Sequence, residues 1–154
     1  MNIRRAAKKD IPGVLNLLSQ VLEVHAGIRP DIFVPGTTKY DSDELSEMFR
    51  DDTRPVYVAC DGDTIIGYAF CQIKETDAST MVARKTVFID DLCVDEAARG
   101  RHVASDLFEF VRSWAKSIGC GDITLNVWEG NDAAISFYRA MGMSVREMQM
   151  ELFI

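Results

Sequence analysis

Apolar residues recur along the chain with two different periods, and these periods predict its secondary structure. Residues 11–22 and 104–118 carry apolar side chains three and four positions apart, as on one face of a helix. Shorter runs rich in β-branched and aromatic residues predict strands. In chain order we expect a strand at 2–6, a helix from an Asp10 cap to about Gly27, a short helix from a Ser42 or Asp43 cap to about Arg50, strands at 55–60, 64–74 and 85–94, a helix at 99–118, a strand at 123–127, a helix at 132–141 and a strand at 143–153.

The order of these elements predicts a single α+β domain over residues 1–154. Asp61, Gly62 and Asp63 separate two β-rich runs, and such a tight turn joins antiparallel strands. The order β-α-α-β-β-β-α-β-α-β is typical of a mixed sheet with helices packed against it. The chain has 154 residues, enough for one domain of ordinary size, and it contains no internal repeat.

The net charge of the chain limits the kinds of binding partner that we expect. The formal net charge is -7, and the acidic residues stand in short clusters such as Asp51-Asp52 and Asp90-Asp91. A protein that binds nucleic acid without sequence preference needs a basic face, so we expect no nucleic-acid partner. An acidic surface would attract a cationic amine, although acidic residues also serve solubility alone.

The cysteines and the first residues bear on the cellular compartment. Cys60, Cys71, Cys93 and Cys120 are far apart in the sequence and form no CxxC pair, so we expect reduced thiols and no metal site. Residues 1–10 are polar and basic, unlike a signal peptide, and no apolar run approaches the length of a membrane span. We therefore expect a cytoplasmic protein without a membrane partner.

The segment VDEAARGRHVAS, residues 94–105, joins a predicted strand to a predicted long helix. The first N–H groups of a helix have no partner within it, and they lie at the positive end of its dipole. Gly100 and Ala104 would let a large anion approach that backbone, and Arg99 and Arg101 add positive charge. The segment could hold a pyrophosphate, and an ordinary helix start is the alternative.

At this junction the sequence resembles the GNAT superfamily of acetyltransferases. The motif of the superfamily is Arg or Gln, two residues, Gly, one residue, and then Gly or Ala. Residues 99–104 (RGRHVA) match it except that His102 replaces the first motif glycine. The ring of His102 would either lie beside a phosphate or point outward, and we favour the outward orientation.

A second block, NVWEGNDAAISFYRAMGM, carries the same resemblance. Asn131, Ala134, Tyr138, Gly142 and Met143 fit the superfamily pattern, with Met143 in a place that is usually Phe. The resemblance makes Tyr138 the general acid that protonates the departing thiolate of coenzyme A, whereas helical spacing alone makes it a core aromatic residue. Asn131 would bind the cofactor, cap the helix, or do both.

The run Asp90-Asp91-Leu92-Cys93-Val94 resembles that of spermidine/spermine-type members, in which the first acid is the proposed general base. By this match Asp90 is the first candidate for the base and Asp91 the second. Neighbouring residues in a strand face opposite ways unless a bulge intervenes, so at least one carboxylate should face the covered side of the sheet. Either acid could instead be solvated or paired with an arginine.

The resemblance also implies a fold and a set of cofactor contacts. The fold is a mixed, mostly antiparallel sheet of six to seven strands flanked by about four helices, in which the fourth and fifth strands splay around the thioester arm of acetyl-CoA. Leu92 and Val94 would pair with that arm through their backbones, and we interpret Cys93 as a buried thiol rather than an acyl carrier. The expected cofactor contacts are Leu92, Cys93, Val94, Arg99, Gly100, Arg101, His102, Val103, Ala104, Ser105, Asn131, Ala134, Phe137 and Tyr138.

The expected function is acetyl-CoA-dependent N-acetylation of a primary amine by direct attack in a ternary complex. Substrate contacts are expected from His25, Phe33 and Glu129, which lie in predicted loops. His25 could also cap the end of the first helix, and we favour that role. The alternative is a non-catalytic GNAT-fold protein that senses acyl-CoA or holds a partner. Dimers are frequent in the superfamily, and the sequence is compatible with a homodimer.

Overall fold

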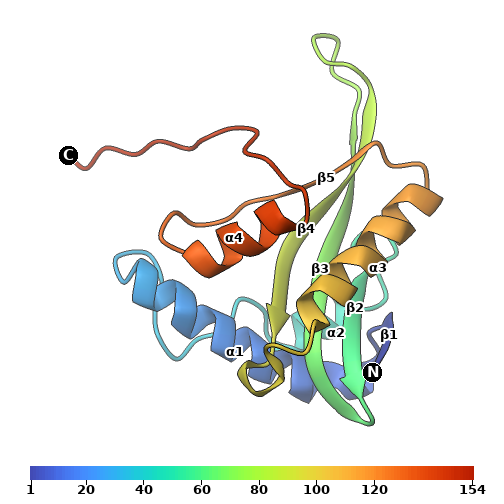
Figure 1. The fold of residues 1–154 in the computed structure, drawn as a ribbon, viewed down its shortest axis with the longest axis vertical. Helices are drawn as coiled ribbons and strands as arrows, with labels where there is room; N and C mark the ends of the chain where they lie inside the picture. Colours follow the sequence, from blue (N-terminus) through green and yellow to red (C-terminus); the bar gives the residue numbers. More distant parts are fainter.

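The computed structural model describes residues 1–154 and contains one five-stranded sheet with helices on both faces (Figure 1). The strands lie in chain order across the sheet, and β5 is an edge strand that pairs only with β4. Neighbouring strands are antiparallel from β1 to β4, whereas β5 runs parallel to β4. The strands are β1 (Asn2–Arg5), β2 (Val56–Asp61), β3 (Thr64–Thr76), β4 (Arg84–Val94) and β5 (Asp122–Leu125).

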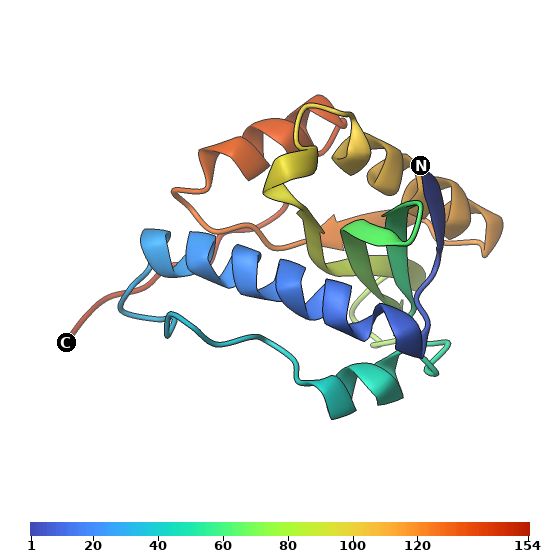
Figure 2. The ribbon, with the colours of Figure 1, turned by 90° about the horizontal axis from the view of Figure 1, so that it is seen from below.

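Two helices cover each face of the sheet, as Figure 2 shows. The first two share one apolar core with the sheet, and the last two lie over the other face. The helices are α1 (Ile11–Ile28), α2 (Ser42–Met48), α3 (Val103–Ser117) and α4 (Asp132–Ala140). Short 3-10 helices precede α1 and α3, namely η1 (Lys8–Asp10) and η2 (Glu96–Ala98).

Strand β2 is apolar from Val56 to Cys60 because both of its faces are covered there. Val56 and Val58 join the core beneath α1, where they meet Leu17. Tyr57 and Ala59 join the core beneath α3. Successive strand residues point to opposite faces, so a strand covered on both sides carries apolar residues at every position.

The segment Lys8–Ile28 is, by length and composition alone, apolar enough to cross a membrane. A core helix passes the same test, and Val14, Leu17 and Leu18 of α1 are fully buried in the core shared with the sheet. The apolar side chains that the sequence shows in this helix thus face the inside of the protein.

Two helix starts differ from the prediction. α2 is capped by Asp41, whose carboxylate accepts the N–H of Glu44, rather than by Ser42 or Asp43. The carboxylate of Asp10 makes no capping bond to α1, because it is engaged by residues that precede the helix. Asp10 and Asp41 both precede a helix. Only Asp41 has an extended backbone, which lets its carboxylate reach the N–H groups of its own helix.

The last predicted strand is absent. Residues 143–154, here called the C-terminal arm, form no helix or strand and extend away from the body of the protein (Figure 1). No strand of this chain pairs with the arm, so its alternating pattern has no ladder to join. The sheet therefore has five strands instead of the expected six to seven, and the predicted order of elements stops at the last helix.

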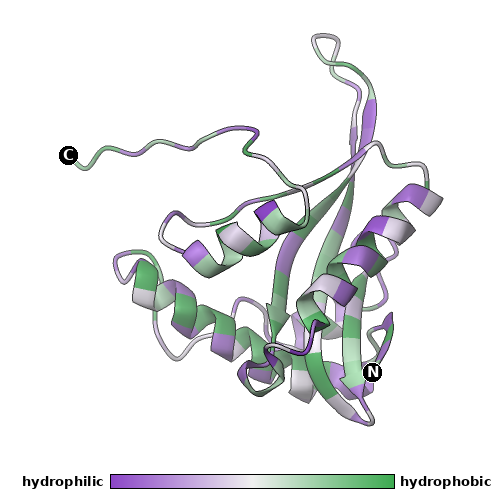
Figure 3. Ribbon diagram, viewed as in Figure 1, coloured by the Kyte–Doolittle hydropathy of each residue, from purple (hydrophilic) through white to green (hydrophobic).

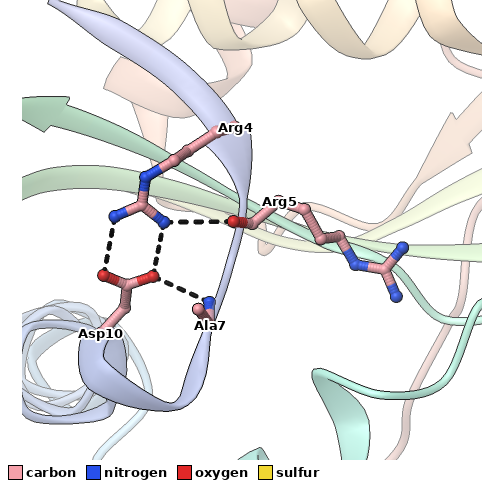
Figure 4. A network of polar contacts seen from close by, with 4 residues as sticks. All are labelled: Arg4, Arg5, Ala7 and Asp10. Atoms are coloured by element: carbon pink, nitrogen blue, oxygen red, sulfur yellow. Dashed lines mark hydrogen bonds and ion pairs between the residues drawn. The ribbon is translucent and has the colours of Figure 1, made fainter.

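A buried ion pair fixes the connection between β1 and α1 (Figure 4). Asp10 is only 4% exposed, and it accepts hydrogen bonds from Nη1 and Nη2 of Arg4 at 2.6 and 2.9 Å and from the N–H of Ala7 at 2.8 Å. Nη1 of Arg4 also donates to the carbonyl of Arg5. The Arg4 guanidinium holds the pKa of Asp10 below its ordinary value of 3.8.

Asp10→Asn should lower the free energy of unfolding by about 2 kcal/mol at neutral pH, because it leaves the partly buried Arg4 guanidinium without its counter-charge. Since the folded-state pKa of Asp10 is lowered, the pair stabilises the protein above about pH 4, and this contribution is lost as the pH falls through the folded pKa. Urea unfolding at neutral pH and at about pH 3 measures both effects, and the deficit of the variant should shrink at the lower pH.

The control for this prediction is Asp52→Asn, because Asp52 is 95% exposed in its pair with Arg5 and should contribute little. Equal losses of stability in the two variants would contradict the role given to Asp10.

Candidate active site

Strands β4 and β5 part halfway along β4, and the opening between them is the centre of the candidate site. Their parallel ladder joins residues 86–89 to residues 122–125 and stops there. Beyond Ile89, β4 continues along β3 to Val94, while the chain after Leu125 leaves the sheet, two residues earlier than predicted. The edge of β4 that faces β5 has no strand partner over this stretch.

The backbone groups of Leu92 and Val94 point into this opening. The N–H of Asp95 donates to the carbonyl of Ile66 in β3. In an antiparallel pair, alternate residues direct their N–H and C=O groups to the same neighbour, so Cys93 also faces β3. Leu92 and Val94 lie between these residues, and their donors and acceptors therefore face away from β3.

A β-bulge brings Asp90 and Asp91 to the same face of the sheet. Phe70 pairs with Asp91 and Cys71 pairs with Ile89, so Asp90 is the extra residue. Both carboxylates accept hydrogen bonds from tyrosines whose rings contact Phe70, on the face covered by α1. Strand alternation without a bulge would have placed the two acids on opposite faces.

Asp91 lies in a poorly solvated environment. The hydroxyl of Tyr68 donates to Oδ2 of Asp91 at 2.8 Å, and Tyr68 is itself fully buried. Burial raises the pKa of Asp91 to about 6, although the hydrogen bond from Tyr68 opposes the shift. A carboxylate with this pKa is mostly ionised at neutral pH and is a stronger proton acceptor than an ordinary one.

Asp90 is engaged by the loop that precedes α2. The hydroxyl of Tyr40 donates to Oδ2 of Asp90 at 2.6 Å, and Nζ of Lys39 lies 3.0 Å from the same oxygen. The ring of Tyr40 stacks on Phe70 with 5.5 Å between centroids, which holds this end of the loop on the sheet. The carboxylate of Asp90 thus already binds a primary ammonium group.

Tyr138 lies over the other face of the sheet. It belongs to α4, where its ring packs against Phe108 and Phe137 with centroids 6.3 and 5.2 Å away. Burial raises the pKa of Tyr138 above its ordinary value of 10.0, and the negative charge of Asp91 adds to the shift. The phenol is therefore protonated at neutral pH, and it lies within electrostatic reach of Asp91.

Cys93 is a buried thiol, in agreement with the interpretation of the sequence. Its Sγ lies in the core beneath α1, 3.7 Å from the carbonyl of Leu17. Burial raises the pKa of the thiol to about 12. Since the thiolate is the nucleophilic form, this side chain is inert at neutral pH.

The turn between β4 and α3 presents unpaired backbone N–H groups. α3 begins at Val103, four residues later than predicted, because residues 99–102 form a turn. Gly100 and His102 both have a positive φ, of 77° and 62°. No acceptor receives the N–H groups of residues 100–105. Consecutive N–H groups in such a turn form a concave nest that suits an anion.

The side chains of this turn are directed elsewhere. Arg101 pairs with Asp61 at 2.7 Å, and the hydroxyl of Ser105 donates to the carbonyl of His102 at 2.8 Å. The imidazole of His102 is exposed, which agrees with the outward orientation. Arg99 is exposed as well and forms no ion pair. Arg101 is therefore committed to Asp61, whereas the backbone N–H groups and the guanidinium of Arg99 have no partner and can meet an anion.

The other residues expected at the cofactor have structural partners. Asn131 is the N-cap of α4, and its Oδ1 accepts the N–H of Ala134 at 3.3 Å. Phe137 packs edge-on against Phe108, which joins α4 to α3. Val103 is only 2% exposed, so its side chain belongs to the core beneath α3. Ala104 is partly buried next to it on the first turn of the helix.

Two of the expected substrate residues lie together. The rings of His25 and Phe33 are 5.1 Å apart, and Trp128 meets Phe33 edge-on at 5.3 Å. Glu129 is exposed and makes no hydrogen bond or ion pair. The expected cap of α1 by His25 is not observed, because the C-cap is Arg29, and burial lowers the pKa of the imidazole.

Four further residues, which the sequence analysis did not single out, complete the site. Lys39 and Tyr40 reach Asp90 from a distant loop, and Tyr40 precedes Asp90 by 50 residues, so no local pattern indicates this contact. Tyr68 reaches Asp91 from the neighbouring strand. Trp128 lies inside the second motif block, which was its only signal in the sequence. No group of three or more His, Cys, Asp and Glu side chains is placed to hold a metal ion.

Comparisons with known proteins agree with this geometry. The profile of the acetyltransferase (GNAT) family matches residues 21–143. No curated protein sequence matches the chain at a significant level. The structure of a tetramutant of the BH1408 protein from Bacillus halodurans has 33% sequence identity and a TM-score of 0.95, and the match covers 100% of both chains.

Two more distant solved structures share the fold. The aminoglycoside N-acetyltransferase AAC(6')-Iy in complex with CoA is 18% identical with a TM-score of 0.73, over 99% of this chain and 98% of that one. The aminoglycoside acetyltransferase meta-AAC0020 from an uncultured soil metagenomic sample, in complex with trehalose, is 20% identical with a TM-score of 0.77, over 99% of this chain and 94% of that one. Because the family profile spans most of the sequence and the fold is shared, the chain belongs to the acetyltransferase (GNAT) family.

Proposed function

We propose that this chain is an N-acetyltransferase that transfers the acetyl group of acetyl-CoA to a primary amine by direct attack in a ternary complex. One observation carries the proposal: the opening between β4 and β5 is bordered by a nest of free N–H groups, a partly buried carboxylate with a raised pKa and a desolvated phenol. Membership of the acetyltransferase family supports acetyl-CoA as the donor, and AAC(6')-Iy is in complex with CoA.

The nest at residues 100–105 fits a pyrophosphate. Its donors are unpaired, the dipole of α3 adds positive potential, and the backbone at Gly100 has open space before it. His102 adopts the left-handed φ that a motif glycine would supply, so the substitution keeps the backbone shape of the turn. His102 in place of the motif glycine is the feature that favours the alternative of a non-catalytic sensor, and the retained backbone shape weakens that alternative.

The free edge of β4 suits the thioester arm. Leu92 and Val94 can pair with its amide groups as a neighbouring strand would. A backbone N–H in this stretch can stabilise the negative charge that develops on the thioester oxygen during attack. Because the thiol of Cys93 is buried and protonated, direct attack by the amine is favoured over an acyl-enzyme.

Asp91 is the better placed of the two candidate bases. The sequence ranks Asp90 first, but Asp90 is held by Lys39 and Tyr40, whereas Asp91 has a pKa raised to about 6 by burial. We therefore propose that Asp91 accepts the proton of the attacking amine, directly or through a water molecule. Asp90 then holds the ammonium group of the substrate in the position that Lys39 occupies here.

Tyr138 supplies the second proton transfer. The N–C bond forms as the C–S bond breaks, and the leaving thiolate takes the phenolic proton of Tyr138. The ordinary pKa values of a phenol and a thiol are close, so a phenol is a suitable proton donor to a departing thiolate. The burial that raises the pKa of Tyr138 keeps the phenol protonated until that step.

We propose a polycationic amine as the acceptor. Asp90 already pairs with the primary ammonium of Lys39, and the net charge of -7 attracts cations, which supports a cationic acceptor. The Asp90-Asp91 run resembles that of spermidine/spermine-type members, and two proteins of the same fold are aminoglycoside acetyltransferases. Polyamines and aminoglycosides share several ammonium groups on one molecule.

Thiol release from acetyl-CoA across a panel of amines tests this function. Wild type should turn over at least one polycationic amine. Tyr138→Phe should reduce kcat by about 100-fold or more, while the Kd for coenzyme A from calorimetry changes by less than about threefold. The control is Tyr57→Phe, since Tyr57 lies in the core beneath α3. Failure of coenzyme A to bind would overturn the function, and equal turnover of both variants would remove the acid role of Tyr138.

Asp91→Asn should remove the rise of kcat/KM with pH that the ionisation of Asp91 produces. If the substrate binds as an ammonium ion and ionised Asp91 takes its proton, kcat/KM should rise with pH through about 6 and then level off. The Asp91→Asn variant should lose this rise and should react at least about 100-fold more slowly. The control Asp77→Asn, at an exposed residue, should keep both the rise and the wild-type rate.

The stability of the variant separates catalysis from folding. Because burial raises the pKa of Asp91, the ionised carboxylate destabilises the folded state at neutral pH, so Asp91→Asn should unfold at no lower temperature than wild type. A variant that keeps the rise near pH 6 would assign the base to another group.

Asp90 and Lys39 should act on substrate affinity in opposite directions. Asp90→Asn should raise KM for a polycationic amine by about tenfold, or ~1.4 kcal/mol, with a smaller change in kcat. Lys39→Ala should lower that KM by roughly threefold, because the side chain no longer competes for the carboxylate. Lys9→Ala, on the exposed surface of η1, is the matched control. If KM were the same in all three variants, Asp90 would not be the ammonium site.

A further inference from the structure

Lys39 holds a primary ammonium group against the carboxylate to which the proposed function assigns the acceptor. Its Nζ lies 3.0 Å from Oδ2 of Asp90, and its side chain is still 45% exposed, so a second molecule can approach it. The lysines that form no ion pair with a carboxylate are Lys8, Lys9, Lys74, Lys85 and Lys116. Lys39 is therefore the lysine of this chain that is placed as the amine of a substrate would be.

The loop between α1 and α2 is fixed to the body of the protein on both sides of Lys39. Before it, the N–H of Gly36 donates to the carboxylate of Glu23 in α1 at 2.8 Å. After it, the hydroxyl of Tyr40 donates to Asp90 in β4 at 2.6 Å. Nζ of Lys39 also lies 5.5 Å from the centre of the Tyr40 ring. The amine is thus held in place by the fold, which is the condition for a reaction within one molecule.

The two groups that the transfer reaction needs lie within reach of this amine. In Figure 3 a hydrophilic band interrupts the apolar colouring of β4, and the sequence VFIDDLCV places Asp90 and Asp91 there. Burial raises the pKa of Asp91, and the positive charge of Lys39 is among the influences that oppose this shift. Burial also raises the pKa of Tyr138, and the charge of Asp91 adds to that shift. Asp91 therefore lies within electrostatic reach of the amine and of the phenol.

We propose that the protein acetylates its own Lys39 with the acetyl-CoA that it binds, a modification that rests on the proposed function. The ammonium of Lys39 gives one proton to Asp91, directly or through water, and Nζ attacks the thioester carbon. The N–C bond forms, the C–S bond breaks, and Tyr138 protonates the leaving thiolate. Tyr138 is reprotonated by the second proton that the nitrogen loses, and Asp91 releases its proton to water. The products are an acetamide at Lys39 and free coenzyme A.

The modification would change how the site binds its substrate. An acetamide carries no charge, so it can no longer form an ion pair with Asp90. The carboxylate of Asp90 is then free to bind the ammonium group of an incoming amine. Lys39 is accordingly an occupant of the site that the first molecule of acetyl-CoA removes, and the acetylated protein should bind a polycationic amine more tightly than the unmodified protein.

Incubation of the purified full chain with acetyl-CoA, without any added amine, tests the proposal. Mass spectrometry of the intact protein should show the addition of one acetyl group per chain, and peptide mapping should locate it at Lys39. Labelling of Lys39 should be at least about tenfold faster than that of the exposed Lys9, because only Lys39 is held beside a base. The rate constant should be the same over a tenfold range of protein concentration, as for a reaction within one chain.

Variants separate a catalysed step from slow chemical acetylation. Asp91→Asn and Tyr138→Phe should each slow the labelling of Lys39 by about 100-fold and leave that of Lys9 unchanged. Asp90→Asn should slow it as well, because the ion pair no longer holds the amine in place. Prior incubation with acetyl-CoA should lower the KM of wild type for spermidine by roughly threefold. Lys39→Arg keeps the positive charge and cannot form the acetamide, so its KM should not respond to this treatment.

The turnover of free amines in the same preparation distinguishes the two proposals. Acetylation of free amines together with an unmodified Lys39 would overturn this inference and leave the proposed function intact. If the protein bound coenzyme A but acetylated neither Lys39 nor any amine, the proposed function would fail and the inference with it. Equal labelling of Lys39 and Lys9, or labelling that is unaffected by the Asp91 and Tyr138 variants, would show an uncatalysed reaction and would also overturn the inference.

Discussion

Hydrogen bonding between β4 and β5 stops after Ile89, and a backbone left unpaired in the middle of a sheet must find another partner. The bulge at Asp90 occurs at the same place, so the strand that loses its neighbour also turns two carboxylates toward one face. Free backbone groups and two neighbouring carboxylates therefore occur at the same place in the ladder. Tyr138 and the turn before α3 lie at the border of the opening between β4 and β5.

Most of the fold could be predicted from the sequence because its signals are local. The helical spacing of apolar residues located α1 and α3, and the Asp61-Gly62-Asp63 turn located the β2–β3 hairpin. The two motif blocks identified the turn before α3 and the helix that carries Tyr138. The bulge at Asp90 could not be predicted, because it depends on the register between β3 and β4 and not on the residues of β4 alone.

The structure differs from the remaining predictions where a residue's contacts come from a segment that is distant in the sequence. Tyr40 and Lys39 reach Asp90 from a loop whose own pattern is irregular, so their role appears only when the chain is folded. The arm shows the complementary case. Its alternation predicts a strand, which is wrong for the structure, because a pattern of this kind does not say which sheet edge would receive the segment.

The pairing of Arg101 with Asp61 has a consequence for how the turn before α3 responds to ionic strength. Neutralised in this way, the guanidinium of Arg101 adds little to the local potential, which leaves the backbone dipoles and the unpaired Arg99 at the turn of an acidic molecule. Dissolved salt screens the long-range repulsion between two negatively charged bodies far more than it screens short N–H contacts. Under the proposed function, the affinity for a phosphorylated ligand should accordingly fall less with added salt than it does in proteins that capture phosphates with clusters of lysine and arginine.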